Sequence, residues 1–143
     1  MRKNKLIVFD IDGTLTDSVK QHQKAFTEML WEIGVKEISS EFKTFKHHTD
    51  LFIAKEIYQE HVESKFSKNV YTQFEKGLTK KINSQEFNEI NGARILIDRL
   101  RDYSTFEVCF ATGSLRRPAE HKLKSVGIPF ENWQLGSIRS YRG

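Results

Sequence analysis

Cysteine and long hydrophobic runs are both scarce in this chain of 143 residues. Its single cysteine, Cys109, cannot form an internal disulfide and lies within an apolar run, which predicts a buried thiol and favours a reducing, cytoplasmic setting. No stretch approaches the length that crosses a membrane, and residues 1–4 lead directly into an apolar segment rather than a signal peptide. We therefore expect a cytoplasmic protein without a membrane partner.

Acidic charge is scarce in the last part of the chain. Residues 115–143 hold six basic residues and only two acidic ones, which accounts for the whole net charge of +4. A basic segment can contact nucleic acid, but the aromatic interleaving typical of such binding does not accompany it. A solvated helix face is favoured instead, and no nucleic-acid partner is expected. Acidic sequence beyond Gly143 would also balance this charge.

The remaining composition is that of an ordinary soluble domain, with 38% hydrophobic and 29% charged residues. Eleven phenylalanines supply large apolar surfaces, which argues against disorder. The length suits one domain with a real core.

Short apolar runs predict the strands of a parallel sheet. Residues 6–9 (LIVF) are continuously apolar, as in a strand buried on both faces, and residues 106–111 (FEVCFA) form a second run. Residues 134–138 predict a third, weaker strand. Helical patterns alternate with these runs, and this alternation predicts an α/β fold.

The long segment between the first two strands is predicted to be mostly helical. Apolar residues from Val19 recur at helical spacing until Gly34 ends the run, and helical patterns continue at residues 51–58 and 70–74. About ninety residues far exceed the dozen that a crossover requires, so part of them should form a separate helical lobe. Breaks in this region are expected near residues 39–40, 47–50 and 80–84.

Two further helices are predicted on either side of the second strand. Residues 93–100 place positions 93, 96, 97 and 100 on one apolar side. The other helix begins near Pro118 and ends before Gly127, because glycine just after a helix and proline shortly beyond it form a strong stop signal.

Two aspartates, Asp10 and Asp12, follow the first apolar run and precede Gly13. Residues i and i+2 of an extended chain point to the same face, so both carboxylates should project beyond the strand, where open α/β sheets bind ligands. Their repulsion calls for a shared proton or a divalent cation, and Mg²⁺ prefers such oxygen ligands. The pair suits phosphoryl transfer, with one carboxylate attacking phosphorus and the other acting as acid and base. The alternative is a β-hairpin turn at Asp12-Gly13.

A second polar group follows the second strand at residues 112–114 (TGS). If the two strands are neighbours, Thr112 lies beside Asp10 at about 4.8 Å, the spacing of adjacent strands. Its hydroxyl, with the amides of Gly113 and Ser114 near a helix start, would then bind phosphate. The alternative is that Thr112 or Ser114 only caps that helix.

The sequence FDIDGTLTDS, residues 9–18, resembles the first signature motif of the haloacid dehalogenase-like hydrolase superfamily. An apolar strand that ends in Thr112 is similar to the second motif. The resemblance implies a Rossmann-like parallel sheet core in which Asp10 is the nucleophile and Asp12 the general acid/base. It also implies that Mg²⁺ lies between the Asp10 carboxylate and the Asp12 main-chain carbonyl. Because an acid stands at position 12, the chain resembles the phosphatases and phosphomutases of the superfamily.

The resemblance further implies a division into core and cap. Residues 1–17 and 91–143 correspond to the core, and residues 18–90 to an inserted all-helical cap, which normally selects the substrate. The most polar break of this cap, which could face the site, comprises His47, His48, Thr49 and Asp50. The remaining histidines, predicted to be surface residues, are His22, His61 and His121.

Two later motifs of the superfamily lack a clear counterpart, so the core is expected to be incomplete at its carboxyl end. The third is a lysine that holds the phosphate; Lys122 and Lys124 come too early for it, and Arg142 is not assigned the role. The fourth is an acidic pair, and residues 127–143 contain no aspartate. A truncated sequence or a protein without catalysis would explain both, and the 143-residue chain alone is expected to turn over poorly or not at all.

The sequence thus predicts an Mg²⁺-dependent phosphatase that hydrolyses a small phosphorylated metabolite through a phosphoaspartate intermediate. The alternatives are a sugar-phosphate mutase of the same superfamily and a non-catalytic protein that binds a phosphate group or a partner. A mutase would return the phosphoryl group to sugar rather than to water. A binding protein would hold phosphate without phosphorylation of Asp10.

Overall fold

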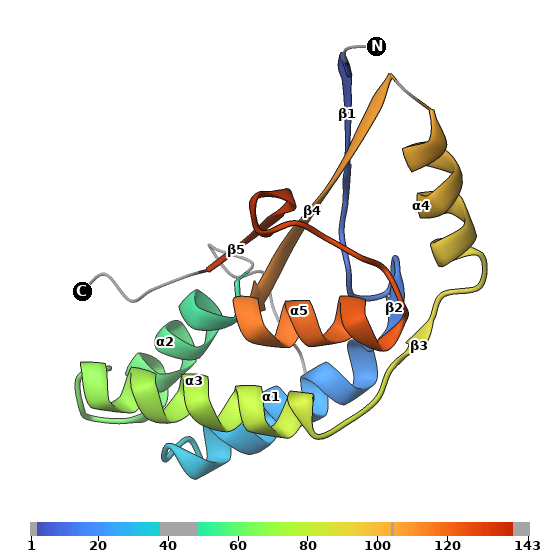
Figure 1. Cartoon of the computed structure of the whole chain (residues 1–143). Coiled ribbons are helices and arrows are strands. Elements are labelled where there is room, and N and C mark those ends of the chain that lie inside the picture. The colour runs from blue at the N-terminus through green and yellow to red at the C-terminus, as the bar shows by residue number, and fades with distance from the viewer. Residues whose placement is uncertain (1–2, 38–48, 104, 139–143) are drawn as a thin grey trace.

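The computed structural model describes residues 3–37, 49–103 and 105–138 of the chain (Figure 1). Its helices are α1 (Val19–Glu32), α2 (Asp50–His61), α3 (Lys68–Asn83), α4 (Ala93–Asp102) and α5 (Arg116–Ser125), with a 3₁₀ turn at Asn132–Gln134. Its strands are β1 (Lys5–Phe9), β2 (Thr16–Asp17), β3 (Asn88–Glu89), β4 (Phe106–Leu115) and β5 (Leu135–Ile138). This order confirms the predicted α/β class. The predicted break at residues 39–40, and His47, His48 and Arg142, lie outside the described residues.

A parallel sheet in the order β1–β4–β5 forms a Rossmann-like core. β1 pairs with β4 from Lys5 opposite Phe106 to Phe9 opposite Phe110, so the two strands predicted from the sequence are neighbours. The predicted third strand is β5, which pairs with the other edge of β4. The connection from β1 to β4 carries α1, α2 and α3, which lie beyond the carboxyl ends of these two strands in Figure 1.

One face of this sheet is covered and the other is open among the described residues. Phe9, Val108 and Phe110 pack into a hydrophobic core that α4 and α5 complete. On the opposite face of β1, Leu6 is 64% exposed and Val8 is 54% exposed. The expectation that the first apolar run is buried on both faces is therefore wrong for one face, because α4 and α5 pack into the same core.

Cys109 shares the open face, since it lies opposite Val8 in the strand register. Its side chain is half-buried, so the prediction of a buried thiol is wrong. Partial burial, together with the nearby Glu107 carboxylate, still raises the pKa of this thiol, and the thiol is therefore protonated at neutral pH.

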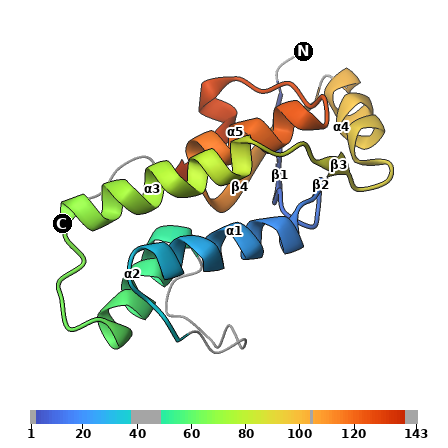
Figure 2. The same ribbon diagram turned by 90° about the horizontal axis from the view of Figure 1, so that it is seen from below.

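The helices α1, α2 and α3 share a second hydrophobic core. Phe26 of α1 meets Phe74 of α3 edge to face, with ring centroids 5.5 Å apart. Tyr58 of α2 meets Phe66 in the same way, also at 5.5 Å. Figure 2, seen from below, shows α1 and α3 running alongside each other. Within the described ranges, no helix is both long and apolar enough to cross a membrane.

The boundaries of two helices differ from those predicted. α3 continues to Asn83, so the break expected at residues 80–84 is wrong over most of its length; Leu78 and Ile82 are fully buried and carry the apolar face of α3 through it. α5 begins at Arg116 rather than near Pro118, because proline is tolerated throughout the first turn and does not mark its first residue.

The end of α5 is fixed by its predicted stop signal. Gly127 adopts φ of 70°. Its amide donates to the Lys124 carbonyl at 3.1 Å, and the Ile128 amide donates to the Leu123 carbonyl at 3.0 Å. These two bonds form a Schellman motif, which satisfies the last carbonyls of the helix and sets where its final turn lies.

Gly77 allows α3 to approach α1 closely, and its replacement should weaken the fold. A Cβ at this position would overlap the terminal carbon and the sulfur of Met29, which is 1% exposed. Gly77→Ala should therefore lower the free energy of unfolding by about 1–3 kcal/mol in urea titrations, although alanine is the better helix former.

The control for this prediction is the double variant Gly77→Ala with Met29→Ala. Removing the Met29 side chain takes away the overlapping atoms, so the alanine at position 77 should cost nothing further in that background. Equal losses from Gly77→Ala in both backgrounds would show that the overlap is not the cause.

Candidate active site

Asp10 and Asp12 lie in the turn that leaves the carboxyl end of β1. The amides of residues 14–16 all donate to the Ile11 carbonyl, at 2.8–3.1 Å, which closes the turn tightly. Gly13 adopts φ of 76°, a backbone conformation that residues other than glycine rarely adopt. The β-hairpin alternative is wrong, because β1 pairs with β4 and β2 pairs with β3.

The Asp12 carboxylate is held by three side chains. Ser18 Oγ donates to its Oδ1 at 2.5 Å, and Ser114 Oγ donates to its Oδ2 at 3.1 Å. Lys122 Nζ lies 2.7 Å from Oδ1. Two hydroxyl donors and one ammonium fix both the orientation of this carboxylate and its charged form.

Lys122 is fully buried, with 0% of its surface exposed. A buried ammonium is costly unless each of its three N–H groups has an acceptor. Its Nζ lies 2.7 Å from Asp12 Oδ1, 2.8 Å from His22 Nδ1 and 3.2 Å from Ser114 Oγ. Three acceptors therefore meet three donors, and the ammonium is satisfied without water.

These contacts decide the charge of Asp12. Burial of its carboxyl would raise the pKa, but the charge of the Lys122 ammonium and the hydrogen bonds from Lys122 and Ser18 outweigh burial and lower the pKa below its ordinary value. Because the folded-state pKa is the lower one, the interaction stabilises the fold above the unfolded-state pKa. That stability is lost as the pH falls through the folded-state pKa.

The chain of contacts continues from Lys122 into the helical segment. His22 Nε2 lies 2.9 Å from Asp50 Oδ1, and each of these side chains is only 12% exposed. The prediction that His22 is a surface residue is therefore wrong. The same prediction is wrong for His121. This residue is half-buried, and its Nε2 lies 2.5 Å from the Gln85 carbonyl oxygen. His61 is exposed, as predicted.

Asp10 differs from Asp12 in its surroundings. Its side chain is exposed, and among the residues that the structure describes none donates a hydrogen bond to its carboxylate or forms an ion pair with it. Both oxygens are therefore free to bind a cation or to attack an electrophile.

The residues of this pair include oxygen donors of the kind that fit Mg²⁺. The Asp10 carboxylate is an unengaged hard oxygen donor of the kind that Mg²⁺ prefers. The Asp12 carboxylate already accepts hydrogen bonds from Ser18 and Ser114 and pairs with Lys122. Within the described residues, no three or more His, Cys, Asp or Glu side chains are grouped to hold a metal ion.

The polar group at the end of β4 is arranged differently from the prediction. Thr112 Oγ1 accepts the Ser114 amide at 3.1 Å, so this amide is engaged rather than free for an anion. The residue that caps α5 is Leu115, without a side-chain bond, so the alternative that Thr112 or Ser114 caps the helix is wrong. The Ser114 hydroxyl turns to Asp12 instead. Phosphate binding by Thr112 and Gly113 stays a prediction.

Sequence reasoning assigned no role to Lys122 or His22, although a signal was present. Lys122 stands at helical spacing among Ala119, Leu123 and Val126, which are buried, so it interrupts the apolar face of α5. His22 extends the buried stripe of α1 in the same way. A charged or polar residue on an apolar helix face needs a buried partner, and here the partners are each other.

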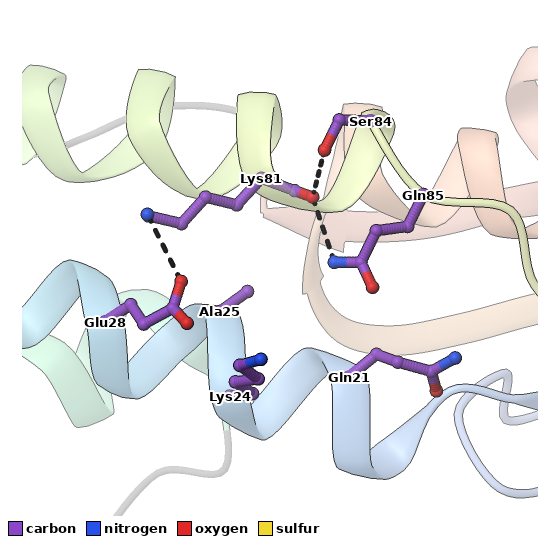
Figure 3. A pocket seen from close by; sticks show the side chains of 7 residues that line it. All are labelled: Gln21, Lys24, Ala25, Glu28, Lys81, Ser84 and Gln85. Atoms are coloured by element: carbon purple, nitrogen blue, oxygen red, sulfur yellow. Dashed lines mark hydrogen bonds and ion pairs between the residues drawn. The ribbon is translucent and has the colours of Figure 1, made fainter.

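A separate polar hollow of about 290 Å³ lies between α1 and α3 (Figure 3). Lys81 Nζ reaches across it from α3, 3.3 Å from Glu28 and 2.9 Å from Glu32 of α1. None of the side chains that contact Asp12 lines this hollow. It therefore belongs to the packing of the two helices and not to the carboxylate site.

Solved structures of other proteins share the fold. CbbY from Rhodobacter sphaeroides in complex with phosphate is 17% identical, with a TM-score of 0.67 over 94% of this chain and 62% of that one. A HAD hydrolase from Entamoeba histolytica is 18% identical, with a TM-score of 0.67 over 100% of this chain and 64% of that one. A predicted phosphoglycolate phosphatase from Haemophilus somnus is 15% identical, with a TM-score of 0.62 over 96% and 62%. This chain thus spans less than two thirds of each of these proteins.

The comparison with curated proteins gives no match. A family model described as haloacid dehalogenase-like hydrolase, however, matches residues 7–131. This range contains both carboxylates of the β1 turn as well as Ser114 and Lys122, and it covers most of the chain. The resemblance found in the first motif is therefore confirmed: the chain belongs to the haloacid dehalogenase-like hydrolase family.

Proposed function

We propose that this chain carries the catalytic pair of an Mg²⁺-dependent phosphatase, which hydrolyses a small phosphorylated metabolite through a phosphoaspartate at Asp10. The observation that carries the proposal is the contrast between two neighbouring carboxylates. Asp10 is exposed and without a described partner, whereas Asp12 is held by Ser18, Ser114 and Lys122. A nucleophile needs free lone pairs, and an acid/base needs a fixed position.

Asp10 supplies the attacking oxygen in this proposal. One of its carboxylate oxygens attacks phosphorus, the bond from phosphorus to the ester oxygen breaks, and the leaving oxygen takes a proton from Asp12. Water then attacks the phosphorus of the acyl phosphate and gives a proton to Asp12. The bond between phosphorus and Asp10 breaks, which releases inorganic phosphate and restores both carboxyl groups.

Lys122 connects the two roles of Asp12. While its ammonium is 2.7 Å from Oδ1, Asp12 is charged and suited to receive a proton from water. To donate a proton, Asp12 must first be protonated. A dianionic phosphate group beside Asp10 adds negative charge near Asp12, which raises the pKa of Asp12 and favours that protonation.

Mg²⁺ and the end of β4 complete the proposed site. The Asp10 carboxylate and the Asp12 main-chain carbonyl would hold the ion, and Thr112 and Gly113 would hold phosphoryl oxygens. When bound, Mg²⁺ supplies positive charge that offsets repulsion between the phosphate and Asp10.

Residues 18–90 are proposed to form the helical cap of this enzyme, with residues 1–17 and 91–143 as its core. The hydrophobic core of α1, α2 and α3, which is distinct from the core under the sheet although Leu115 of β4 joins it, supports that division. The single cysteine supports a reducing, cytoplasmic setting.

Asp10→Asn should prevent phosphorylation of the chain. The amide has nearly the same shape but is a far weaker nucleophile. Turnover by this 143-residue chain is expected to be poor, but a single phosphorylation does not require turnover. Incubation with Mg²⁺ and acetyl phosphate should therefore add one phosphoryl group to the wild type and none to the variant, measured by intact mass. Asp98→Asn, on the exposed side of α4, is the matched control and should be phosphorylated normally. Phosphorylation of the Asp10→Asn chain, or absence of phosphorylation from the wild type, would overturn the proposal.

Asp12→Asn should separate the two steps. Acetyl phosphate has a good leaving group that needs little help from an acid, so the phosphoaspartate should still form. Its hydrolysis should be about 10²–10⁴ times slower, because no base accepts the proton of the attacking water. The measurement is the loss of the adduct mass after the donor is removed. Decay at the wild-type rate would exclude Asp12 as the base.

Lys122→Met should raise the pKa of Asp12 and weaken the fold at neutral pH. Burial of Asp12 would remain while its nearest cation is gone, so the free energy of unfolding should fall by roughly 3 kcal/mol. The difference from the wild type should shrink as the pH falls through the Asp12 pKa, because a protonated Asp12 gains little from Lys122. Urea unfolding of metal-free protein across the acid range measures both effects.

The control for this prediction is Lys124→Met on the same helix. Lys124 is exposed, so its replacement should leave the pH dependence of unfolding unchanged. If Lys122→Met lowered stability equally at every pH, its effect would come from packing and not from the charge of Asp12.

A further inference from the structure

His22 and Asp50 form the outer half of a line of four ionisable side chains that ends at Asp12. Asp50 Oδ1 lies 2.9 Å from His22 Nε2, His22 Nδ1 lies 2.8 Å from Lys122 Nζ, and that Nζ lies 2.7 Å from Asp12 Oδ1. Asp50 opens α2, His22 belongs to α1 and Lys122 to α5. We propose that His22 and Asp50 are positioning residues, which hold the Lys122 ammonium against the acid/base of the site.

The donor and acceptor of each hydrogen bond in this line can be assigned. A lysine ammonium has three donors and no acceptor, so His22 Nδ1 must accept from Lys122 and carries no proton. The proton of the neutral imidazole is then on Nε2, where it is donated to Asp50 Oδ1 at 2.9 Å. Asp50 thus selects the His22 tautomer that can hold Lys122, as a carboxylate behind a ligating histidine does at metal sites.

The surroundings of Asp50 indicate that this residue does more than stabilise the fold. The residue is 8% exposed, and its second oxygen, Oδ2, is buried without a hydrogen-bond partner among the residues that the structure describes. A carboxylate in the first turn of a helix gains a modest amount from the helix dipole. A buried carboxylate oxygen that lacks a hydrogen bond costs more than this gain. The contact with His22 is therefore the interaction that explains a buried carboxylate at position 50.

The inference joins the helical segment to the chemistry of the core. Ser114 and Asp12, the other two acceptors of Lys122, come from β4 and the β1 turn, whereas His22 comes from the segment after the turn. The third acceptor of Lys122 is therefore present only when His22 of α1 lies beside α5. The consequence for turnover rests on the proposed function, whereas the hold on Lys122 does not.

The first test measures the hold on Lys122 in the chain without substrate. In the wild type, ¹⁵N shifts of the His22 ring should show protonated Nε2 and unprotonated Nδ1. The Lys122 ammonium protons should exchange slowly with water. In His22→Ala this exchange should be at least about tenfold faster, since one of three hydrogen bonds is gone. Asp50→Ala should reduce the share of the Nε2–H tautomer.

A conservative variant distinguishes loss of the hydrogen bond from loss of folding. The side-chain carbonyl of His22→Asn lies near the place of Nδ1, so it can accept from Lys122 and should restore most of the slow exchange. His61→Ala, an exposed histidine on α2, is the matched control and should change neither measurement.

The second test asks whether the hold matters to the reaction. After phosphorylation by acetyl phosphate, the adduct of His22→Ala should decay roughly ten to a hundred times more slowly than that of the wild type, because Asp12 is displaced. The adducts of His22→Asn and His61→Ala should decay at nearly the wild-type rate.

The outcomes separate this inference from the proposed function. Unchanged ammonium exchange in His22→Ala, or wild-type decay of its adduct, overturns the inference. If His22→Ala does not fold, failure of Asp50→Ala to shift the tautomer overturns it. If the exchange changes as expected but the wild type is never phosphorylated, the proposed function fails and the hold of His22 on Lys122 stands.

Discussion

A lysine ammonium sealed from water is the constraint on which the rest of this structure depends. Lys122 has no exposed surface, so each of its donors must find an acceptor within the protein. Those acceptors come from three separate parts of the chain: the β1 turn, the end of β4 and α1. A shift of any of these by the length of a hydrogen bond would leave a buried charge uncompensated. The buried ammonium therefore specifies how sheet and helices meet.

The same cation divides two chemically identical carboxylates into different groups. Asp10 and Asp12 are two residues apart, yet Asp12 lies next to the ammonium with a lowered pKa, while Asp10 faces outward with its oxygens unengaged. The two side chains are identical, but their surroundings differ: Ser18, Ser114 and Lys122 hold Asp12, whereas Asp10 is exposed. Family membership and this electrostatic difference support the same proposed roles.

Much of the fold follows from local patterns in the sequence. The apolar runs predicted β1 and β4, and Gly34 and Gly127 marked the ends of α1 and α5, because these signals act over a few residues. Long-range contacts were harder to foresee. Lys122 and His22 are one hundred residues apart, and no local pattern says that one meets the other. Burial of β1 was overestimated for the same reason, since a run of apolar residues does not say which helices will cover it.

The motif residues of the site could be predicted from the sequence, but the residues that hold them in place could not. Asp10 and Asp12 follow a strand in a recognisable order, whereas Ser18 and Ser114 are ordinary residues until the fold brings them to Asp12. The sequence does contain a signal for two of the supporting residues. Lys122 and His22 are each a single polar residue on the otherwise apolar face of a helix, and two such residues are candidates for contact with one another.

The open side of β1 bears on the mechanical precision of the site. Among the described residues, β1 is hydrogen-bonded along one edge only, to β4, and its Leu6 and Val8 side chains face outward. Asp10 stands at the tip of this strand, so its position is stiffened from one side. Any polypeptide that pairs with the second edge of β1 would hold Asp10 more firmly, and unwanted association at that edge would compete with such pairing.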